Sequence, residues 1–329
     1  MNTDNPFATP HAELTSSESV PVPASRQPYP FIVAQIVATL CLFGLSMGWQ
    51  WFNSGAQFRE QIERVMPMLI SSTVGSLLIY SAAVLLLVHG QRERHGILRF
   101  RPLGALLAGY LVLYLLCSLA LNAGLAVLGS SYYGWALEQE NRQFWVLLYT
   151  QGSGLLNLLL TCLLPLWLVL CLARSGSERI AKGLRTPVAG WQVALGIGLC
   201  FSAVLYKAAS SLAVSVMMLY REGDYWQPFF QFIGCAVPFA VVMLAARARL
   251  PAQVERFAAG RVLGASLVLL TMWGACVLLC SIVLAFLVLD SGNYLNPPPI
   301  VLVPAILCLA ALWPLTRWST GWFFPARAS

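Results

Sequence analysis

Eight long stretches of the chain consist almost entirely of apolar residues, and they constrain its fold more than any other feature. A helix needs about 20 largely apolar residues to cross the hydrocarbon core, where its backbone polar groups must be satisfied internally. The sequence therefore predicts eight transmembrane helices, over residues 31–51, 66–89, 103–128, 145–172, 189–219, 228–246, 262–289 and 299–316.

The overall composition agrees with this prediction. Of the 329 residues, 58% are hydrophobic and 10% are charged, whereas a soluble domain is about 45–50% apolar and about 25% charged. That leaves too little polar surface to coat a water-soluble enzyme, and it excludes a disordered or disulfide-rich secreted chain. The predicted fold class is an all-α, polytopic membrane bundle. Residues 1–30 form a flexible polar Pro/Ser-rich tail, 31–316 the transmembrane domain and 317–329 an interfacial tail.

The Lys and Arg residues alternate between the two sides of the predicted bundle. Fifteen of the 20 fall in one set of alternate connectors and tails, four fall in the other, and one lies within a span. Because Lys and Arg are retained on the cytoplasmic side, we expect both termini in the cytoplasm and a location in a bacterial inner membrane. We expect these basic connectors to contact anionic lipid headgroups or a protein partner, and we expect no contact with nucleic acid. Their residues are Arg92, Arg94, Arg99, Arg101, Arg174, Arg179, Lys182, Arg185, Arg247, Arg249, Arg256 and Arg261.

A proline precedes each span that leaves the predicted cytoplasmic side: Pro28, Pro102, Pro187 and Pro251. Proline suits the first helical turn, where its missing N–H is not needed. The pattern divides the membrane region into four parallel helical hairpins. Internal duplication is one explanation. Helix-start chemistry combined with topology is the favoured one, because no longer residue string recurs.

Lys207 is the one charged residue deep within an apolar stretch. A Lys near the bilayer centre costs about 2.5–3.5 kcal/mol on insertion scales and usually faces the bundle interior or a wet cavity. Ser210 and Ser211 follow on the same helix face. We predict a polar cavity around these residues, with Asn122 and Asn157 among its lining. The alternative is that the Lys207 side chain extends outward to the interface.

Other intramembrane polar groups have a simpler explanation. Gln35, Ser71, Gln151 and Thr161 are expected to form hydrogen bonds between helices. The nine cysteines all lie in or beside apolar stretches, where cysteine acts as a small hydrophobic residue. We therefore expect no metal site and no cofactor.

Three functions remain open. The favoured function is that of a non-catalytic membrane scaffold or accessory subunit. Such a protein would contact a protein partner or a second copy of itself through its tail and basic connectors. The alternative is a transporter or permease-like bundle that binds a small anionic or polar solute around Lys207. An intramembrane enzyme ranks third, because the chain has no phosphate loop, no His-Glu-x-x-His and no Gly-x-Ser-x-Gly.

Overall fold

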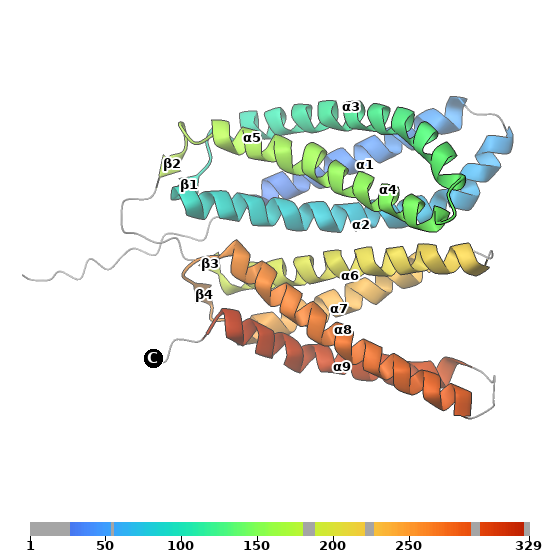
Figure 1. Cartoon of the computed structure of the whole chain (residues 1–329). Coiled ribbons are helices and arrows are strands. Elements are labelled where there is room, and N and C mark those ends of the chain that lie inside the picture. The colour runs from blue at the N-terminus through green and yellow to red at the C-terminus, as the bar shows by residue number, and fades with distance from the viewer. Residues whose placement is uncertain (1–26, 54–55, 180–187, 221–226, 291–296, 326–329) are drawn as a thin grey trace, which may run out of the picture.

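The computed structural model describes residues 27–53, 56–179, 188–220, 227–290 and 297–325, most of them in long helices that divide into two halves (Figure 1). The first half contains α1 (Pro28–Asn53), α2 (Ala56–His95), α3 (Leu103–Leu137), α4 (Arg142–Asn157), the π-helical turn η1 (Leu158–Leu163) and α5 (Leu164–Leu172). The second half contains α6 (Gly190–Tyr220), α7 (Gln227–Arg249), α8 (Ala259–Asp290) and α9 (Pro297–Phe323).

The helices of the two halves pack in the same pattern. In the first half α1 packs on α2, α3 packs on the α4–η1–α5 rod, α1 touches α3, and α2 touches η1 and α5. In the second half α6 packs on α7, α8 on α9, α6 on α8 and α7 on α9. Each half is therefore a bundle of two neighbouring helical hairpins. Whether the halves arose by duplication stays a prediction.

Six helical segments among the described residues are long and apolar enough to cross a membrane: Pro28–Asn53, Leu69–His95, Leu103–Leu137, Phe144–Leu172, Gly190–Ser210 and Ala259–Phe286. They are consistent with the predicted all-α membrane bundle. Helices α7 and α9 coincide with the other two predicted spans and pack within the same bundle. The count of eight crossings stays a prediction.

Four short strands lie in the connectors, so the all-α prediction misses this detail. β1 (Ile97–Arg99) pairs antiparallel with β2 (Glu178–Arg179), and β3 (Val188–Ala189) pairs antiparallel with β4 (Gln253–Val254). All four lie at one end of the bundle, which we call the strand-bearing end (Figure 1). Helices α1, α3, α6 and α8 each begin at this end.

The expectation that Pro251 starts a helix is wrong. β4 follows Pro251, and α8 begins only at Ala259. The backbone N–H of Gly190 donates to the carbonyl of Ala252 at 2.9 Å, which extends the β3–β4 pairing. Pairing with a segment far away in the sequence therefore overrides the helix-start signal of the proline. Pro28 begins α1 as predicted, and Pro187 lies outside the described residues.

The core follows the line where the halves meet. Within the most apolar part of each helix, 56% of the residues of α6 and 39% of those of α2 are buried, against 6% of those of α8. α2 packs on α6, and also touches α7 and α8. We call the α2–α6 contact the seam. The outward faces carry exposed apolar side chains, such as Leu45 (72% exposed) and Phe286 (69%). Such surfaces are expected where hydrocarbon replaces water as the solvent.

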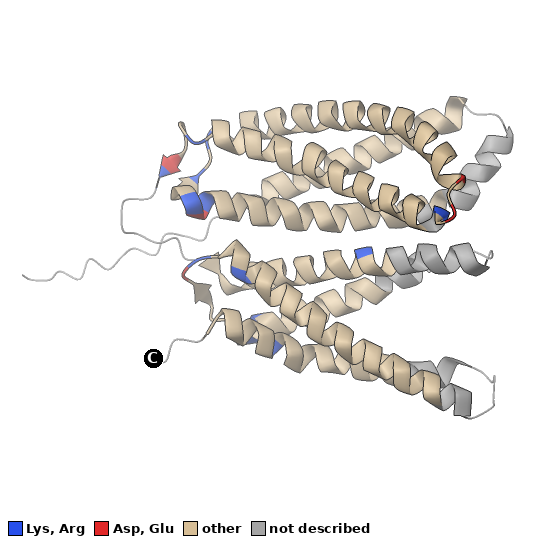
Figure 2. Ribbon diagram, in the orientation of Figure 1, with Lys and Arg blue, Asp and Glu red and all other residues tan. Residues whose placement is uncertain are grey.

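Charged residues gather at the ends of the bundle (Figure 2). The strand-bearing end carries most of the described Lys and Arg residues, and the long middle sections of the helices are almost free of charge (Figure 2). This distribution matches the alternation found in the sequence.

Candidate functional site

Tyr206 of α6 joins the two halves at the seam. Its hydroxyl donates to the backbone carbonyl of Ser71 on α2 at 2.6 Å, and it lies 2.6 Å from the Ser71 hydroxyl. The ring packs where α2 has Gly75, and a Cβ placed there would lie 2.6 Å from a Tyr206 ring carbon. A glycine at position 75 is therefore needed for this close approach of the two halves.

Lys207, the next residue, extends across to the first half. Its Nζ lies 3.6 Å from the position that a Cβ on Gly154 of α4 would occupy. The Lys207 side chain is half-buried. The ammonium group therefore lies between the halves and faces a position on α4 that has no side chain.

Polar residues flank Gly154 on α4. Gln151 and Asn157 stand three residues before and after it, so helical spacing places all three on neighbouring parts of one face. Both side chains are half-buried. Gln151 and Lys207 each take part in a polar or electrostatic interaction. Together these four residues form what we call the Lys207 site.

The α4 helix changes geometry directly after this site. In η1 the backbone N–H of Leu164 reaches back to the carbonyl of Leu159, a π-helical spacing. Pro165 follows and cannot donate to a carbonyl of the preceding turn. Thr161 within η1 donates to both the backbone carbonyl of Asn157 (2.7 Å) and its side-chain oxygen (2.9 Å). The π-helical turn therefore orients the Asn157 side chain, and such turns occur frequently at functional sites.

A second group of buried polar side chains lies within the first half. The Tyr110 hydroxyl donates to the side-chain oxygen of Gln35, a fully buried residue. The Gln35 amide donates to Thr39 at 3.0 Å, and the Thr39 hydroxyl lies 3.0 Å from that of Tyr114. These bonds join α1 to α3. They satisfy polar groups that would otherwise be costly in hydrocarbon, so a structural role explains them fully.

The predicted cavity residues do not all come together. Asn157 belongs to the Lys207 site, but Asn122 lies at an exposed position on α3. The Ser210 hydroxyl donates to the backbone carbonyl of Lys207 at 2.9 Å, so it is engaged within its own helix. Ser211 lies in α6, and its side chain is outside the described part of the structure. The sequence did not single out Gly154, because it has no side chain to mark it, although Gln151 and Asn157 flank it at helical spacing.

The hydrogen bonds expected between helices are present for Gln35 and Ser71. Thr161 donates to Asn157 within its own helical rod, and it also hydrogen-bonds the Tyr80 side chain of α2, so its interhelical bond is present as well. A hydroxyl group in a membrane helix can donate to a backbone carbonyl one turn earlier in its own helix or to a neighbouring helix. The sequence does not show which of these bonds a given residue forms.

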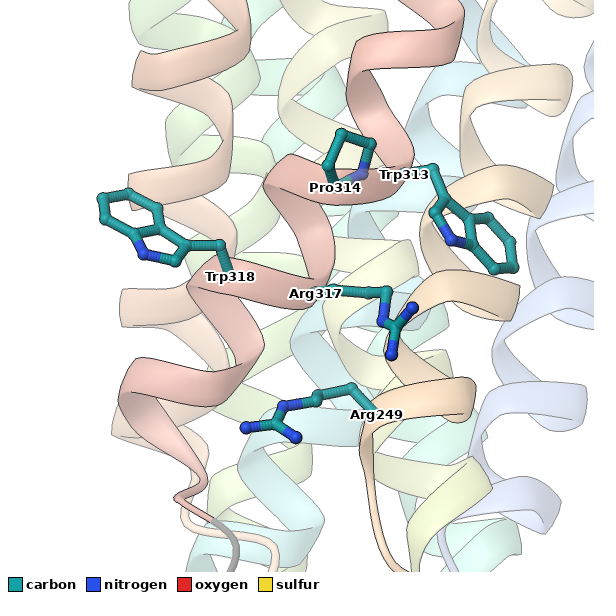
Figure 3. Close-up of a pocket in the computed structure, with 5 residues that line it drawn as sticks. All are labelled: Arg249, Trp313, Pro314, Arg317 and Trp318. Atoms are coloured by element: carbon teal, nitrogen blue, oxygen red, sulfur yellow. The ribbon is translucent and has the colours of Figure 1, made fainter.

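A pocket of about 400 Å³ lies near the strand-bearing end, between α7 and α9 (Figure 3). Its lining consists of Arg249, Trp313, Pro314, Arg317 and Trp318. Arg249 comes from α7 and the other four residues from α9, and the two guanidinium groups lie below the two indoles in the view of Figure 3. Only Arg249 was among the predicted lipid contacts.

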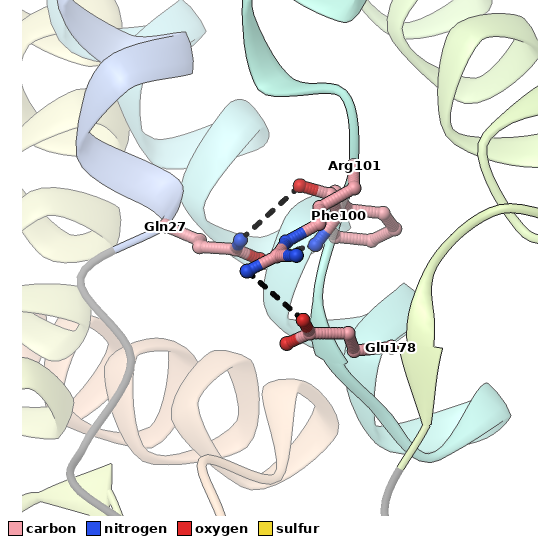
Figure 4. A network of polar contacts seen from close by, with 4 residues as sticks. All are labelled: Gln27, Phe100, Arg101 and Glu178. Carbon is pink, nitrogen blue, oxygen red and sulfur yellow. Dashed lines mark hydrogen bonds and ion pairs between the residues drawn. The ribbon is translucent and has the colours of Figure 1, made fainter.

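The other predicted basic contacts have varied surroundings. Arg101 pairs with Glu178 at 3.0 Å, beside the two hydrogen bonds that join the Gln27 side chain to the Phe100 backbone (Figure 4). Arg174 donates to Gln91 at 2.9 Å. Arg92 is only 4% exposed, so it does not offer a surface to headgroups. The exposed ones are Arg94, Arg99, Arg101, Arg179, Arg247, Arg249, Arg256 and Arg261, and Lys182 and Arg185 lie outside the described residues.

Among the residues that the structure describes, no three His, Cys, Asp or Glu side chains cluster closely enough to hold a metal ion. Comparisons with protein-family models, curated proteins and solved structures gave no match to this chain.

Proposed function

We propose that this protein binds a small anionic or polar solute at the Lys207 site and moves it across the membrane as a transporter or permease-like bundle. One observation carries the proposal: the Lys207 ammonium extends from the second half toward Gly154 of the first. We assign no covalent chemistry to the site.

The energetics of a charged side chain support this function. A Lys at membrane depth costs about 2.5–3.5 kcal/mol on insertion scales and usually marks a solute or ion path. Lys207 is half-buried, and its Nζ lies beside Gly154 of the other half. The amide side chains of Gln151 and Asn157 add hydrogen-bonding groups on the facing helix. An anionic group would therefore find a cation and neutral polar groups together.

The arrangement of the halves supports the same function. Their first helices, α1 and α6, begin at the same end, so the halves are parallel rather than inverted. Some transporters are built from two parallel halves with the substrate between them. The Lys207 site has this position here. We therefore rank solute binding above the scaffold function that the sequence alone favoured. No contact among the described residues specifically supports a scaffold.

The proposal includes a topology. We propose that α7 and α9 also cross the bilayer, giving eight spans, and that both termini lie in the cytoplasm of a bacterial cell. The excess of Lys and Arg in alternate connectors supports this orientation.

A ligand screen on purified protein in lipid nanodiscs tests the function. The thermal unfolding midpoint would be measured with a panel of small carboxylates, phosphate esters and neutral polar solutes. We expect at least one class of anion to raise the midpoint of the wild type. Lys207→Met, which removes the charge and keeps a similar volume, should abolish that rise, and Lys207→Arg should keep part of it.

Two glycine variants provide a matched control. Gly154→Leu should block binding, because its side chain would occupy the space that faces the ammonium. Gly152→Leu is the control on the same helix, since a Cβ at Gly152 meets nothing within 4 Å. Anion-dependent stabilisation that persists in Lys207→Met, or that is lost equally in both glycine variants, would count against the Lys207 site.

A further inference from the structure

We propose that the pocket between α7 and α9 binds the headgroup of an anionic phospholipid, with the phosphodiester held between Arg249 and Arg317. This site is separate from the Lys207 site, and it would serve the protein whatever solute that site takes. Three features support this lipid site: the two cations, their surroundings and the apolar face beside them.

The chain places the Arg249 guanidinium against α9. A Cβ on Gly321 would lie 3.3 Å from Arg249 Nε and 3.5 Å from Nη2. Gly321 follows Arg317 by four residues, so both lie on one face of α9. A residue without a side chain at 321 therefore lets the Arg249 guanidinium lie across the helix on the face that also carries Arg317.

Neither cation has a carboxylate partner in the described part of the chain. Arg101 at this end pairs with Glu178, and the pocket lining contains no acid. Two guanidinium groups that share a pocket repel each other unless an anion lies between them. Arginine is well suited to a phosphate, because its planar fork donates two parallel hydrogen bonds.

The rest of the lining fits the bilayer interface. Trp313 is 41% exposed and Trp318 is 46% exposed, and indoles favour the headgroup level of a membrane. Farther along α9 stand the exposed side chains of Val303, Ile306 and Leu307, of which Ile306 lies two helical turns from Trp313 on the same face. Acyl chains could cover this face while the headgroup occupies the pocket.

Three buried hydroxyl residues of α9 fix this outward orientation of Arg317. Thr316, Ser319 and Thr320 are fully buried, and the first two donate to carbonyls of their own helix. The helix cannot rotate to hide Arg317 without exposing them. A ligand for this surface needs a negative headgroup and apolar tails, which describes an anionic phospholipid and does not describe free phosphate.

Native mass spectrometry of the detergent-purified protein tests the proposal. We would titrate phosphatidylglycerol and phosphatidylcholine of equal chain length and count bound lipids. The wild type should bind phosphatidylglycerol on the order of tenfold more tightly than the Arg249→Gln/Arg317→Gln double variant, because charge-assisted bonds are lost. The matched control, Arg142→Gln, removes an exposed arginine outside the pocket that is not among the predicted headgroup contacts and should bind like the wild type.

Further arms separate folding and the source of the phosphate. Gly321→Leu keeps both charges but displaces the Arg249 guanidinium, so it should also weaken phosphatidylglycerol binding. This variant decides the question if the double variant does not fold. Inorganic phosphate at millimolar concentration should leave the lipid bound. Equal binding of the two lipids, wild-type binding by Gly321→Leu, or displacement by inorganic phosphate would each overturn the proposal.

Discussion

The carboxylate of Glu93, at the end of α2, accepts the backbone N–H of Ala258, with its oxygens at 3.0 and 3.1 Å. Ala258 immediately precedes α8, and its carbonyl accepts the backbone N–H groups of Arg261 and Val262 in the first turn of that helix. An acid from the first half therefore caps a helix of the second half. Nearby His89 stacks on Phe257 at 4.1 Å between ring centroids, which joins the halves at the same point.

Replacing Glu93 should loosen this joint. Glu93→Gln keeps the size of the side chain but removes the negative charge that interacts favourably with the N-terminus of α8. The free energy of unfolding should fall by about 1 kcal/mol. The thermal unfolding midpoint in detergent should fall. Glu178→Gln breaks only an exposed ion pair with Arg101, which is worth about 0–1 kcal/mol, so its effect should be smaller. Equal midpoints for Glu93→Gln and the wild type would refute the capping role.

Ala258→Gly should stabilise the protein. Ala258 has φ 48°, in the left-handed region, which costs a residue with a Cβ about 1–2 kcal/mol. Glycine adopts this conformation without that cost, although part of the gain is lost to its greater freedom when unfolded. We expect a higher unfolding midpoint. Ala259→Gly, at the first residue of α8, lacks this benefit and should not raise the midpoint.

Two glycines of α2 should respond in opposite directions to alanine. At Gly75 a Cβ would lie 2.6 Å from the Tyr206 ring, so Gly75→Ala should separate the seam and cost about 1–3 kcal/mol. At Gly90 a Cβ meets nothing within 4 Å, so Gly90→Ala should gain about 1 kcal/mol of helix propensity. Unfolding midpoints of both variants check this. A seam that tolerates Gly75→Ala as well as Gly90→Ala would contradict the packing described.

The chain contains only two lysines, Lys182 and Lys207, which permits a direct test of hydration. In a Lys182→Arg background, a sulfonated amine reagent can modify only Lys207 and the amino terminus. We expect modification of Lys207, detected by peptide mass spectrometry, because a solute site must admit water. Gly154→Leu should reduce it. A Lys207 that stays unmodified while the amino terminus reacts fully would argue for a sealed seam.

The two connectors that hold β1 and β2 should face the same compartment. Ile97 pairs with Arg179 across this ladder, and the excess of basic residues predicts that this compartment is the cytoplasm. Fluorescent-protein and alkaline-phosphatase fusions after residues 96 and 176 should both report a cytoplasmic position. A fusion after residue 139 should report the opposite side. Opposite reports from the first two fusions would contradict the ladder as well as the topology.

The positions of the apolar helices could be predicted closely. The span expected at 103–128 lies within α3 (Leu103–Leu137), and the one at 228–246 lies within α7. The helices extend beyond the predicted spans because hydropathy locates the hydrocarbon core and a helix need not end at its boundary. The short strands were missed, because two or three residues carry no pattern that identifies their pairing partner.

The candidate site could be predicted only in part. Lys207 was evident, because a charged residue stands out within an otherwise apolar stretch of the sequence. Its position opposite Gly154 was not, because a glycine shows no chemistry of its own. Asn122 was expected in the same cavity, but the sequence does not show which way α3 is rotated.

The sequence by itself determined that hydrocarbon solvates most of this molecule, where its apolar helices lie and which connectors carry the positive charge. These properties depend on the residue content of short continuous segments, so they need no knowledge of the neighbouring helices. Only the tertiary structure decided that the helices form two halves, that Lys207 faces Gly154 and that Arg249 lies on Gly321. In a bundle that is apolar all round, many helix rotations satisfy hydropathy equally. Close packing at small residues and the few polar contacts between helices select one of them.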